Sequence, residues 1–147
     1  MDNLIFIDAS GFSMWPFLKS GEKLIVKKVP VKDLKIGDII LYKAREQLVC
    51  HRFVKKLNSE DGYLLYTRAD ASPNLDEAIT EKMLIGKVTG ILRKGRVINF
   101  MGRWRCFVNR LIVEFAPFLK IGIKLGKGPI IYVRSLVRRW RKFENKP

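Results

Sequence analysis

Residues 34–57, LKIGDIILYKAREQLVCHRFVKKL, contain the pattern that decides the fold. Two runs in it are rich in branched and aromatic residues. DIILYK at 38–43 begins at the aspartate of a Gly-Asp pair, and QLVCHRFVKKL at 47–57 ends at the turn-forming segment NSEDG. Runs of this composition that are bounded by Gly and Asp are typical of β-strands joined by tight turns. The stretch therefore predicts two strands, and the second of them carries His51, the single histidine of the chain.

The same pattern extends outward over the first 100 residues. Further runs of this kind are LIFI (4–7), KLIVKKV (23–29), YLLYTRA (63–69) and LIGKVTGIL (84–92). The turn-forming segments SGE, NSEDG, ASPN and RKGR separate them. Many short strands with tight turns predict a mainly β fold, either a small barrel or a folded-over sheet. We recognise no internal repeat.

The hydrophobic period changes at about residue 101. Apolar residues recur every three or four positions in RWRCFVNRLIVEFA at 103–116, and again in IIYVRSLVRRWRKF at 130–143. This spacing places the apolar residues on one face of a helix. We therefore expect a β domain over residues 1–100 and a basic, amphipathic α-helical extension over residues 101–147.

The formal net charge of +15 is distributed unevenly. Residues 93–147 hold 15 Lys and Arg against two acidic residues, so +13 of the charge lies there. Such a basic tail favours an anionic partner. Because bulky apolar residues lie beside the basic ones, we expect residues 101–143 to contact an anionic membrane surface. The alternatives are packing of the apolar stripes on the β domain, and nucleic acid, which no recognised nucleic-acid motif supports.

The start of the chain lacks the features of a secretory leader. MDNLIFIDAS at 1–10 has no basic region, and no run in the chain reaches the ~18 apolar residues of a membrane span. We therefore expect the protein on the cytoplasmic side, peripheral at the inner membrane. Two cysteines, Cys50 and Cys106, and one histidine give no metal-ligand spacing, so we expect reduced thiols, no metal and no cofactor.

GFSMWPFL at 11–18 places Ser13 between a Gly-aromatic pair and a Met-x-Pro turn. A serine in a turn ordinarily hydrogen-bonds to the nearby backbone. It can act as a nucleophile only when a positioned base accepts its proton. His51 is the candidate base, because an imidazole carries little charge at neutral pH.

The strand around His51 decides which neighbours could work with it. Alternation places Val49 and Phe53 on the face of His51 and Cys50 on the opposite face, so Cys50 is a poor nucleophile for this base. An imidazole base works best with a carboxylate on its other nitrogen. Asp70 and Asp76, in TRADASPNLDEAI, could each supply it, although turn formation would also explain both.

Together these segments resemble the boxes of signal peptidase I and LexA-like serine peptidases. GFSMWPFLKSGEKLIVKK resembles the nucleophile box, LKIGDIILYK the next box, TRADASPNLD the acidic box and IGKVTGILRKGRV the strand that closes the domain. VCHRFV looks like the His-Arg box of the endoplasmic-reticulum and archaeal branch, which uses histidine where bacterial members use lysine. The resemblance covers residues 5–98, about two thirds of the chain.

The resemblance implies a compact, mainly β fold and the activity of a serine endopeptidase. The enzyme would cleave a leader or signal-type peptide from a precursor protein through an acyl-enzyme, after small residues. Ser13 would be the nucleophile, and His51 the general base and then the acid for the leaving amine. Asp76 would be the triad acid, and Asp70 would support the network or the fold.

Two departures from the family pattern concern the oxyanion hole and the first Gly-Asp pair. Gly11 stands where many bacterial members have a hydroxyl, so we expect oxyanion and substrate contacts from the backbone at Gly11, Ser13 and Met14, with Ser10 as a compensating group. The loss of one donor typically costs ~10²–10³ in rate. Glu22 replaces the usual aspartate, which we expect to be structural.

Three alternatives remain open on the sequence. The chain could be a catalytically inactive or regulatory binding module with a peptidase fold, which acts at a membrane surface or on nucleic acid. It could also be a DNA-bound regulator, although no helix-turn-helix segment precedes the serine box. Lys55 or Lys56 could serve as the base in place of His51.

Overall fold

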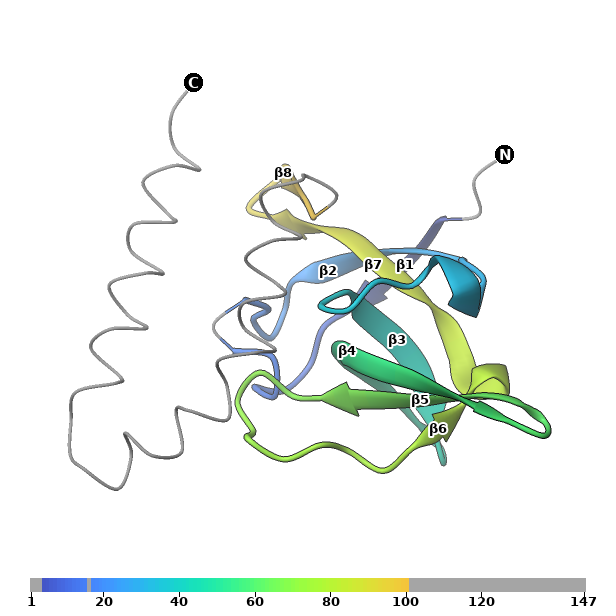
Figure 1. Ribbon diagram of the computed structural model, residues 1–147. Coiled ribbons are helices and arrows are strands. Elements are labelled where there is room, and N and C mark those ends of the chain that lie inside the picture. Colours follow the sequence, from blue (N-terminus) through green and yellow to red (C-terminus); the bar gives the residue numbers. More distant parts are fainter. Residues whose placement is uncertain (1–3, 16, 101–147) are drawn as a thin grey trace, which may run out of the picture. The chain divides into compact units, whose positions relative to one another are not determined.

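The computed structural model describes residues 4–15 and 17–100, which form a mainly antiparallel β-sheet of eight strands (Figure 1). The strands are β1 (Leu4–Asp8), β2 (Lys23–Lys27), β3 (Ile39–Ala44), β4 (Gln47–Ser59), β5 (Gly62–Arg68), β6 (Ile79–Thr80), β7 (Leu84–Arg93) and β8 (Arg96–Asn99). The helical elements of this part are two short 3₁₀ turns, η1 (Val31–Asp33) and η2 (Glu81–Met83). The mainly β prediction is confirmed, and the predicted helical extension lies outside the described residues.

The strands pair in the order β1-β2-β7-β3-β4-β5-β6, and β8 pairs with β7. Every pair is antiparallel. Strand β7 joins the β1-β2 hairpin to the β3-β4-β5 meander, so residues far apart in the sequence meet in the middle of the sheet (Figure 1). No pairing between β1 and β6 closes the described sheet into a barrel.

Strand β3 is buried on both faces, which explains its unbroken apolar run. Ile39 and Leu41 pack into one hydrophobic cluster, which also contains Met14 and residues of β2 and β7. Ile40 and Tyr42 pack into a second cluster on the other face, with residues of β4, β5 and β6. Full burial of one such aliphatic side chain stabilises the fold by roughly 1.5–3 kcal/mol.

A short turn motif occurs twice, as LKSGE at 18–22 and LKIGD at 34–38. In each turn the backbone N–H of the lysine donates to the carboxylate three residues later, at 2.9 Å in the first and 2.8 Å in the second. Strand β7 supplies a cation to each carboxylate, Arg93 in the first turn and Lys87 in the second. The two turns therefore share one arrangement, in which a carboxylate accepts from a backbone N–H and binds a cation of β7.

Two strands and one turn carry no clear signal in the sequence. Strands β6 and β8 were not among the predicted runs; β6 has two residues, and β8 follows a turn formed by Lys94 and Gly95 with φ of 50° and 75°. The β3-β4 turn contains Arg45 at φ 53° without a glycine or asparagine. Within the described residues, no helix has the length and apolar character that a bilayer-spanning segment needs.

Candidate active site

Strand β4 places His51 opposite Ile40 of β3, with an imidazole that is 15% exposed. Val49 and Phe53 pack in the second cluster, whereas Cys50 packs against the first. The predicted alternation along this strand is therefore confirmed. The imidazole of His51 is therefore largely buried beside the second cluster, and a small part of it is exposed.

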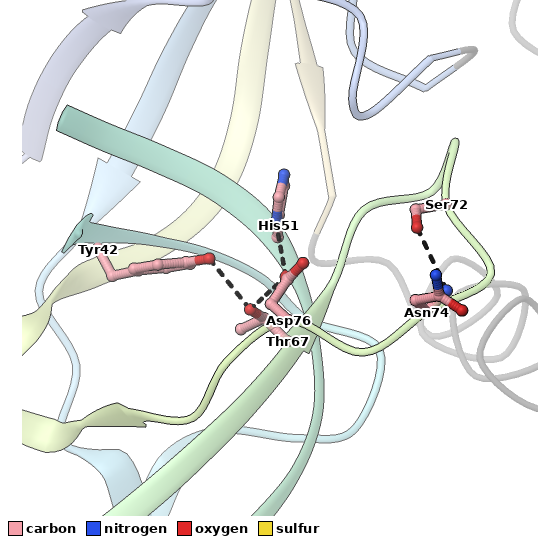
Figure 2. Close-up of polar contacts among 6 residues, drawn as sticks. All are labelled: Tyr42, His51, Thr67, Ser72, Asn74 and Asp76. Carbon is pink, nitrogen blue, oxygen red and sulfur yellow. Dashed lines mark hydrogen bonds and ion pairs between the residues drawn. The ribbon is translucent and has the colours of Figure 1, made fainter. Parts of the chain in front are cut away.

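The imidazole of His51 is hydrogen-bonded to Asp76. Nδ1 of His51 lies 2.7 Å from Oδ2 of Asp76 (Figure 2). Because an ionised carboxylate can only accept, Nδ1 carries the proton and donates it to this bond. The neutral imidazole then has its lone pair on Nε2, which points away from Asp76 in Figure 2. A histidine held in this way has a free basic nitrogen, as a general base requires.

Asp76 is itself held by strand β5. Its backbone N–H donates to the carbonyl of Thr67 at 2.9 Å, and the Thr67 hydroxyl donates to Oδ2 of Asp76 at 2.7 Å. The hydroxyl of Tyr42 lies 3.1 Å from Oγ1 of Thr67 (Figure 2). The sequence pattern does not reveal the roles of Thr67 and Tyr42. Alternation along a strand predicts the face on which a side chain lies, but not the side chain that it contacts.

Asp70 lies in a different interaction from Asp76. The guanidinium of Arg52 binds both carboxylate oxygens of Asp70, with Nε at 2.7 Å and Nη2 at 2.6 Å. Both side chains are almost fully buried, at 1% and 3% exposed, and Nη1 of Arg52 donates to the carbonyl of Gly37 at 2.9 Å. The structure thus brings Asp76 to His51 and assigns Asp70 to an internal ion pair.

Ser13 lies in an exposed turn between β1 and β2. Its carbonyl accepts a hydrogen bond from the backbone N–H of Ala71 at 2.9 Å, which joins the serine turn to the loop that carries both aspartates. The guanidinium of Arg52 also lies 5.4 Å from the centre of the Phe17 ring. Two contacts therefore join the buried ion pair and its loop to the serine turn.

Within residues 4–15 and 17–100, no hydrogen bond joins the Ser13 hydroxyl to His51. Catalytic hydrogen bonds are often long in the absence of substrate and shorten when it binds. In the same part of the chain, the backbone N–H of Ser13 has no acceptor, so it is available as an oxyanion donor.

The other two residues expected to contact substrate differ in their exposure. Gly11 has φ of 82°, a conformation that favours glycine, and nothing lies within 4 Å of the position that a Cβ would take. The side chain of Met14 is buried in the first cluster, at 4% exposed. Contact between Met14 and a substrate is thus limited to its main chain, and its side chain anchors the turn.

Glu22 anchors the far end of the serine turn. Its side chain accepts from the backbone N–H of Lys19 at 2.9 Å and from Arg93, whose Nη2 also donates to the carbonyl of Phe17 at 3.1 Å. The backbone carbonyl of Glu22 accepts from Ala9 at 2.7 Å. These contacts agree with the structural role expected for this residue.

The ammonium groups of Lys55 and Lys56 contact other groups than Ser13 and His51 in the described residues. Nζ of Lys55 lies 4.6 Å from the centre of the Tyr66 ring, and Nζ of Lys56 donates to the carbonyl of Val31 at 3.1 Å. A lysine base must reach the nucleophile directly or through one water. The contacts of both lysines therefore favour His51 as the base.

His51 and Asp76 border an open pocket of about 560 Å³. Its lining includes the apolar residues Val49, Ile79 and Met83 and the charged residues Arg45 and Glu46 of the β3-β4 turn. Among the described residues, no three His, Cys, Asp or Glu side chains gather as metal ligands do. The pocket offers space for an apolar side chain next to the His51–Asp76 pair.

Two ionisable groups near the site are held in their neutral forms. Burial, with a smaller effect of the Asp70 charge, raises the pKa of the Cys50 thiol to about 12. Burial likewise raises the pKa of Tyr42, and the Thr67 hydrogen bond only partly offsets it. At neutral pH Cys50 is therefore a thiol and a poor nucleophile, and Tyr42 retains its hydroxyl proton.

Comparison of the chain with protein-family models, curated proteins and solved structures finds no match. The resemblance to signal peptidase I rests on the sequence boxes alone and stays a prediction.

Proposed function

We propose that this protein is a serine endopeptidase that cleaves a leader or signal-type peptide from a precursor protein. The observation that carries the proposal is the 2.7 Å hydrogen bond between His51 Nδ1 and Asp76 Oδ2, which leaves Nε2 as the basic nitrogen. The bond from Ala71 to the Ser13 carbonyl supports it, because that bond links the serine turn to the Asp76 loop. The order of boxes that resembles signal peptidase I points to the same chemistry.

In the proposed mechanism, Ser13 Oγ attacks the scissile carbonyl while His51 Nε2 takes the hydroxyl proton. The carbonyl oxygen becomes an oxyanion and accepts from the backbone N–H of Ser13. As the C–N bond breaks, His51 returns the proton to the leaving amine, and an acyl-Ser13 ester remains. Water then attacks the ester with His51 again as the base, which releases the acid product and restores the serine.

The partners of the proposed enzyme are a precursor protein or peptide and an anionic membrane surface. Residues 101–143, outside the described part of the chain, carry the basic and apolar residues for membrane contact. Binding at the inner leaflet would place the active site on the cytoplasmic side. The mechanism uses no cofactor.

Two observations favour a second candidate, a peptidase-like binding module without activity. The Ser13 hydroxyl makes no hydrogen bond to His51 in the described residues, and Gly11 offers no side-chain donor. Such a module would bind its ligand equally well with Ser13 replaced by alanine. Steeply salt-dependent DNA binding would instead indicate the nucleic-acid alternative.

A cleavage assay on a broad peptide pool, with anionic lipid vesicles present, distinguishes these functions. Mass spectrometry reads the new termini made by the wild type, by Ser13→Ala and by Ser20→Ala, an exposed serine of the same loop that serves as the control. We expect identical products from the wild type and Ser20→Ala and none from Ser13→Ala. The same assay is then repeated with a full-length precursor as the substrate. Equal product profiles from all three proteins in both assays would contradict the proposal.

A further inference from the structure

We propose that Thr67 and Tyr42 are positioning residues for the histidine base: together they hold Oδ2 of Asp76 against His51 and fix the tautomer of the imidazole. Their catalytic meaning rests on the proposed peptidase function. The hydrogen-bond chain itself is independent of that function and can be tested without a substrate.

The donor of each hydrogen bond between Tyr42, Thr67 and Asp76 follows from the number of protons available. Thr67 has a single hydroxyl proton, and its Oγ1 lies 2.7 Å from Oδ2 of Asp76, an atom that can only accept. The Thr67 proton is thus used, so Tyr42 must donate its own proton to Oγ1 across 3.1 Å. Burial raises the pKa of Tyr42, which keeps that proton in place at neutral pH.

Two donors converge on one oxygen of Asp76. Oδ2 receives Nδ1–H of His51 and Oγ1–H of Thr67, both at 2.7 Å (Figure 2). The Asp76 side chain is 26% exposed, so without Thr67 water could bind the carboxylate and let it rotate. The carbonyl of Thr67 also accepts a hydrogen bond from the backbone N–H of Asp76, at 2.9 Å. Thr67 therefore orients the Asp76 carboxylate so that Oδ2 faces His51.

Both hydroxyl residues are buried. Thr67 is 0% exposed and Tyr42 is 3% exposed, so in the folded protein bulk water does not compete for the hydrogen bonds of these hydroxyl groups. Buried polar networks are rigid when every member is satisfied, and no described buried side-chain nitrogen or oxygen lacks a partner. A rigid carboxylate favours the Nδ1–H tautomer of His51 and leaves Nε2 as the base.

Nitrogen-15 NMR of the imidazole tests the proposal directly, because His51 is the only histidine in the chain. In the wild type we expect the Nδ1–H tautomer and a low-field Nδ1–H proton signal that exchanges slowly. Thr67→Val keeps the shape but removes the hydroxyl, and we expect the proton signal to disappear and the Nε2–H tautomer to become populated. Thr67→Ser restores the hydroxyl and is expected to restore the wild-type spectrum.

Kinetics on a cleaved peptide provide the second measurement. We expect Thr67→Val to lower kcat about 10-fold or more with little change in KM, since a hydrogen bond to a charged group is lost away from the substrate. Thr67→Ser should recover most of this loss. If the wild type cleaves nothing but the NMR changes occur as described, the proposed function fails and the positioning chain stands.

An unchanged His51 spectrum in Thr67→Val, in a protein whose backbone amide spectrum matches the wild type, would overturn the proposal. If Thr67→Val does not fold, Tyr42→Phe decides the matter, because it removes the outer donor alone. We expect the Nδ1–H proton of His51 to exchange faster with solvent in Tyr42→Phe than in the wild type. Exchange at the wild-type rate would overturn the positioning role of Tyr42.

Discussion

At the scale of single residues, one loop carries two aspartates with different surroundings. Oδ2 of Asp76 accepts from His51, whereas Asp70 is bound on both oxygens by Arg52. The sequence placed both carboxylates near His51 but could not choose between them, because the choice depends on side chains 18 and 25 positions away. Thr67, the second donor to Asp76, was not foreseen for the same reason.

Replacing each aspartate by asparagine separates stability from activity. We expect Asp70→Asn to lower the free energy of unfolding by about 3–5 kcal/mol, because Arg52 then keeps a buried, poorly compensated charge. We expect Asp76→Asn to retain the fold and to lower kcat by about 10⁴, as loss of the correct histidine tautomer does in other triads. Thermal unfolding measures the first effect and peptide cleavage the second. A large loss of stability in Asp76→Asn, together with a large loss of kcat but a stable fold in Asp70→Asn, would contradict these roles.

The thiol of the partly buried residue Cys50 gives a prediction about pH. Burial raises its pKa from 9.0 to about 12, so the folded protein keeps the proton through a range in which the unfolded chain loses it. This contribution to stability is complete below pH 9 and declines as the pH rises towards 12. In a Cys106→Ser background, we expect little reaction of native Cys50 with iodoacetamide at pH 8.

The stability part of this prediction is measured by urea unfolding. The free energy of unfolding should fall more steeply between pH 9 and 12 in Cys106→Ser than in the Cys50→Ser/Cys106→Ser double variant. Rapid alkylation of the folded protein at pH 8, or identical pH curves for the two proteins, would show that the folded protein does not raise the pKa of the Cys50 thiol.

At the scale of the elements, the sequence predicts the long strands well and the short ones poorly. The run at 47–57 became β4 (Gln47–Ser59), because branched and aromatic residues on both faces suit a strand between two others. Strand β6 has only two residues, too few for a periodic signal. The β3-β4 turn places Arg45 in a conformation that residue type alone does not suggest. Tertiary packing, which the sequence pattern does not contain, decides these positions.

Strand β7 has a glycine, Gly86, that lies close against the backbone of β2. A Cβ at Gly86 would lie 2.6 Å from the carbonyl oxygen of Lys27, a backbone atom that cannot move freely. We expect Gly86→Ala to lower the free energy of unfolding by about 1–3 kcal/mol, as overpacking does. Val97→Ala, on an exposed side chain of β8, should change it by less than about 0.5 kcal/mol. Chemical unfolding compares the two, and equal stability of Gly86→Ala and the wild type would contradict the packing.

At the scale of the whole molecule, charge separates two parts of the chain. Residues 93–147 carry +13 of the net charge of +15. We expect the full chain to sediment with vesicles that contain anionic lipid, and the bound fraction to fall as salt is added. Replacing Arg138, Arg139 and Arg141 by glutamine should weaken binding about 100-fold, at ~1 kcal/mol for each charge. Lys32→Gln, an exposed lysine of η1, is the control, and equal loss of binding there would contradict a role of the tail.

The central claim, that His51 and Asp76 make Ser13 a nucleophile, is tested most directly by acyl transfer from an activated ester. p-Nitrophenyl acetate needs no native substrate, and intact-protein and peptide mass spectrometry after an acid quench locates the acetyl group. The account predicts rapid acetylation of Ser13 in the wild type and in Ser20→Ala, no acetylation at that position in Ser13→Ala, and slow acetylation in His51→Ala. Acetylation of Ser13 in the wild type no faster than in His51→Ala would contradict the claim.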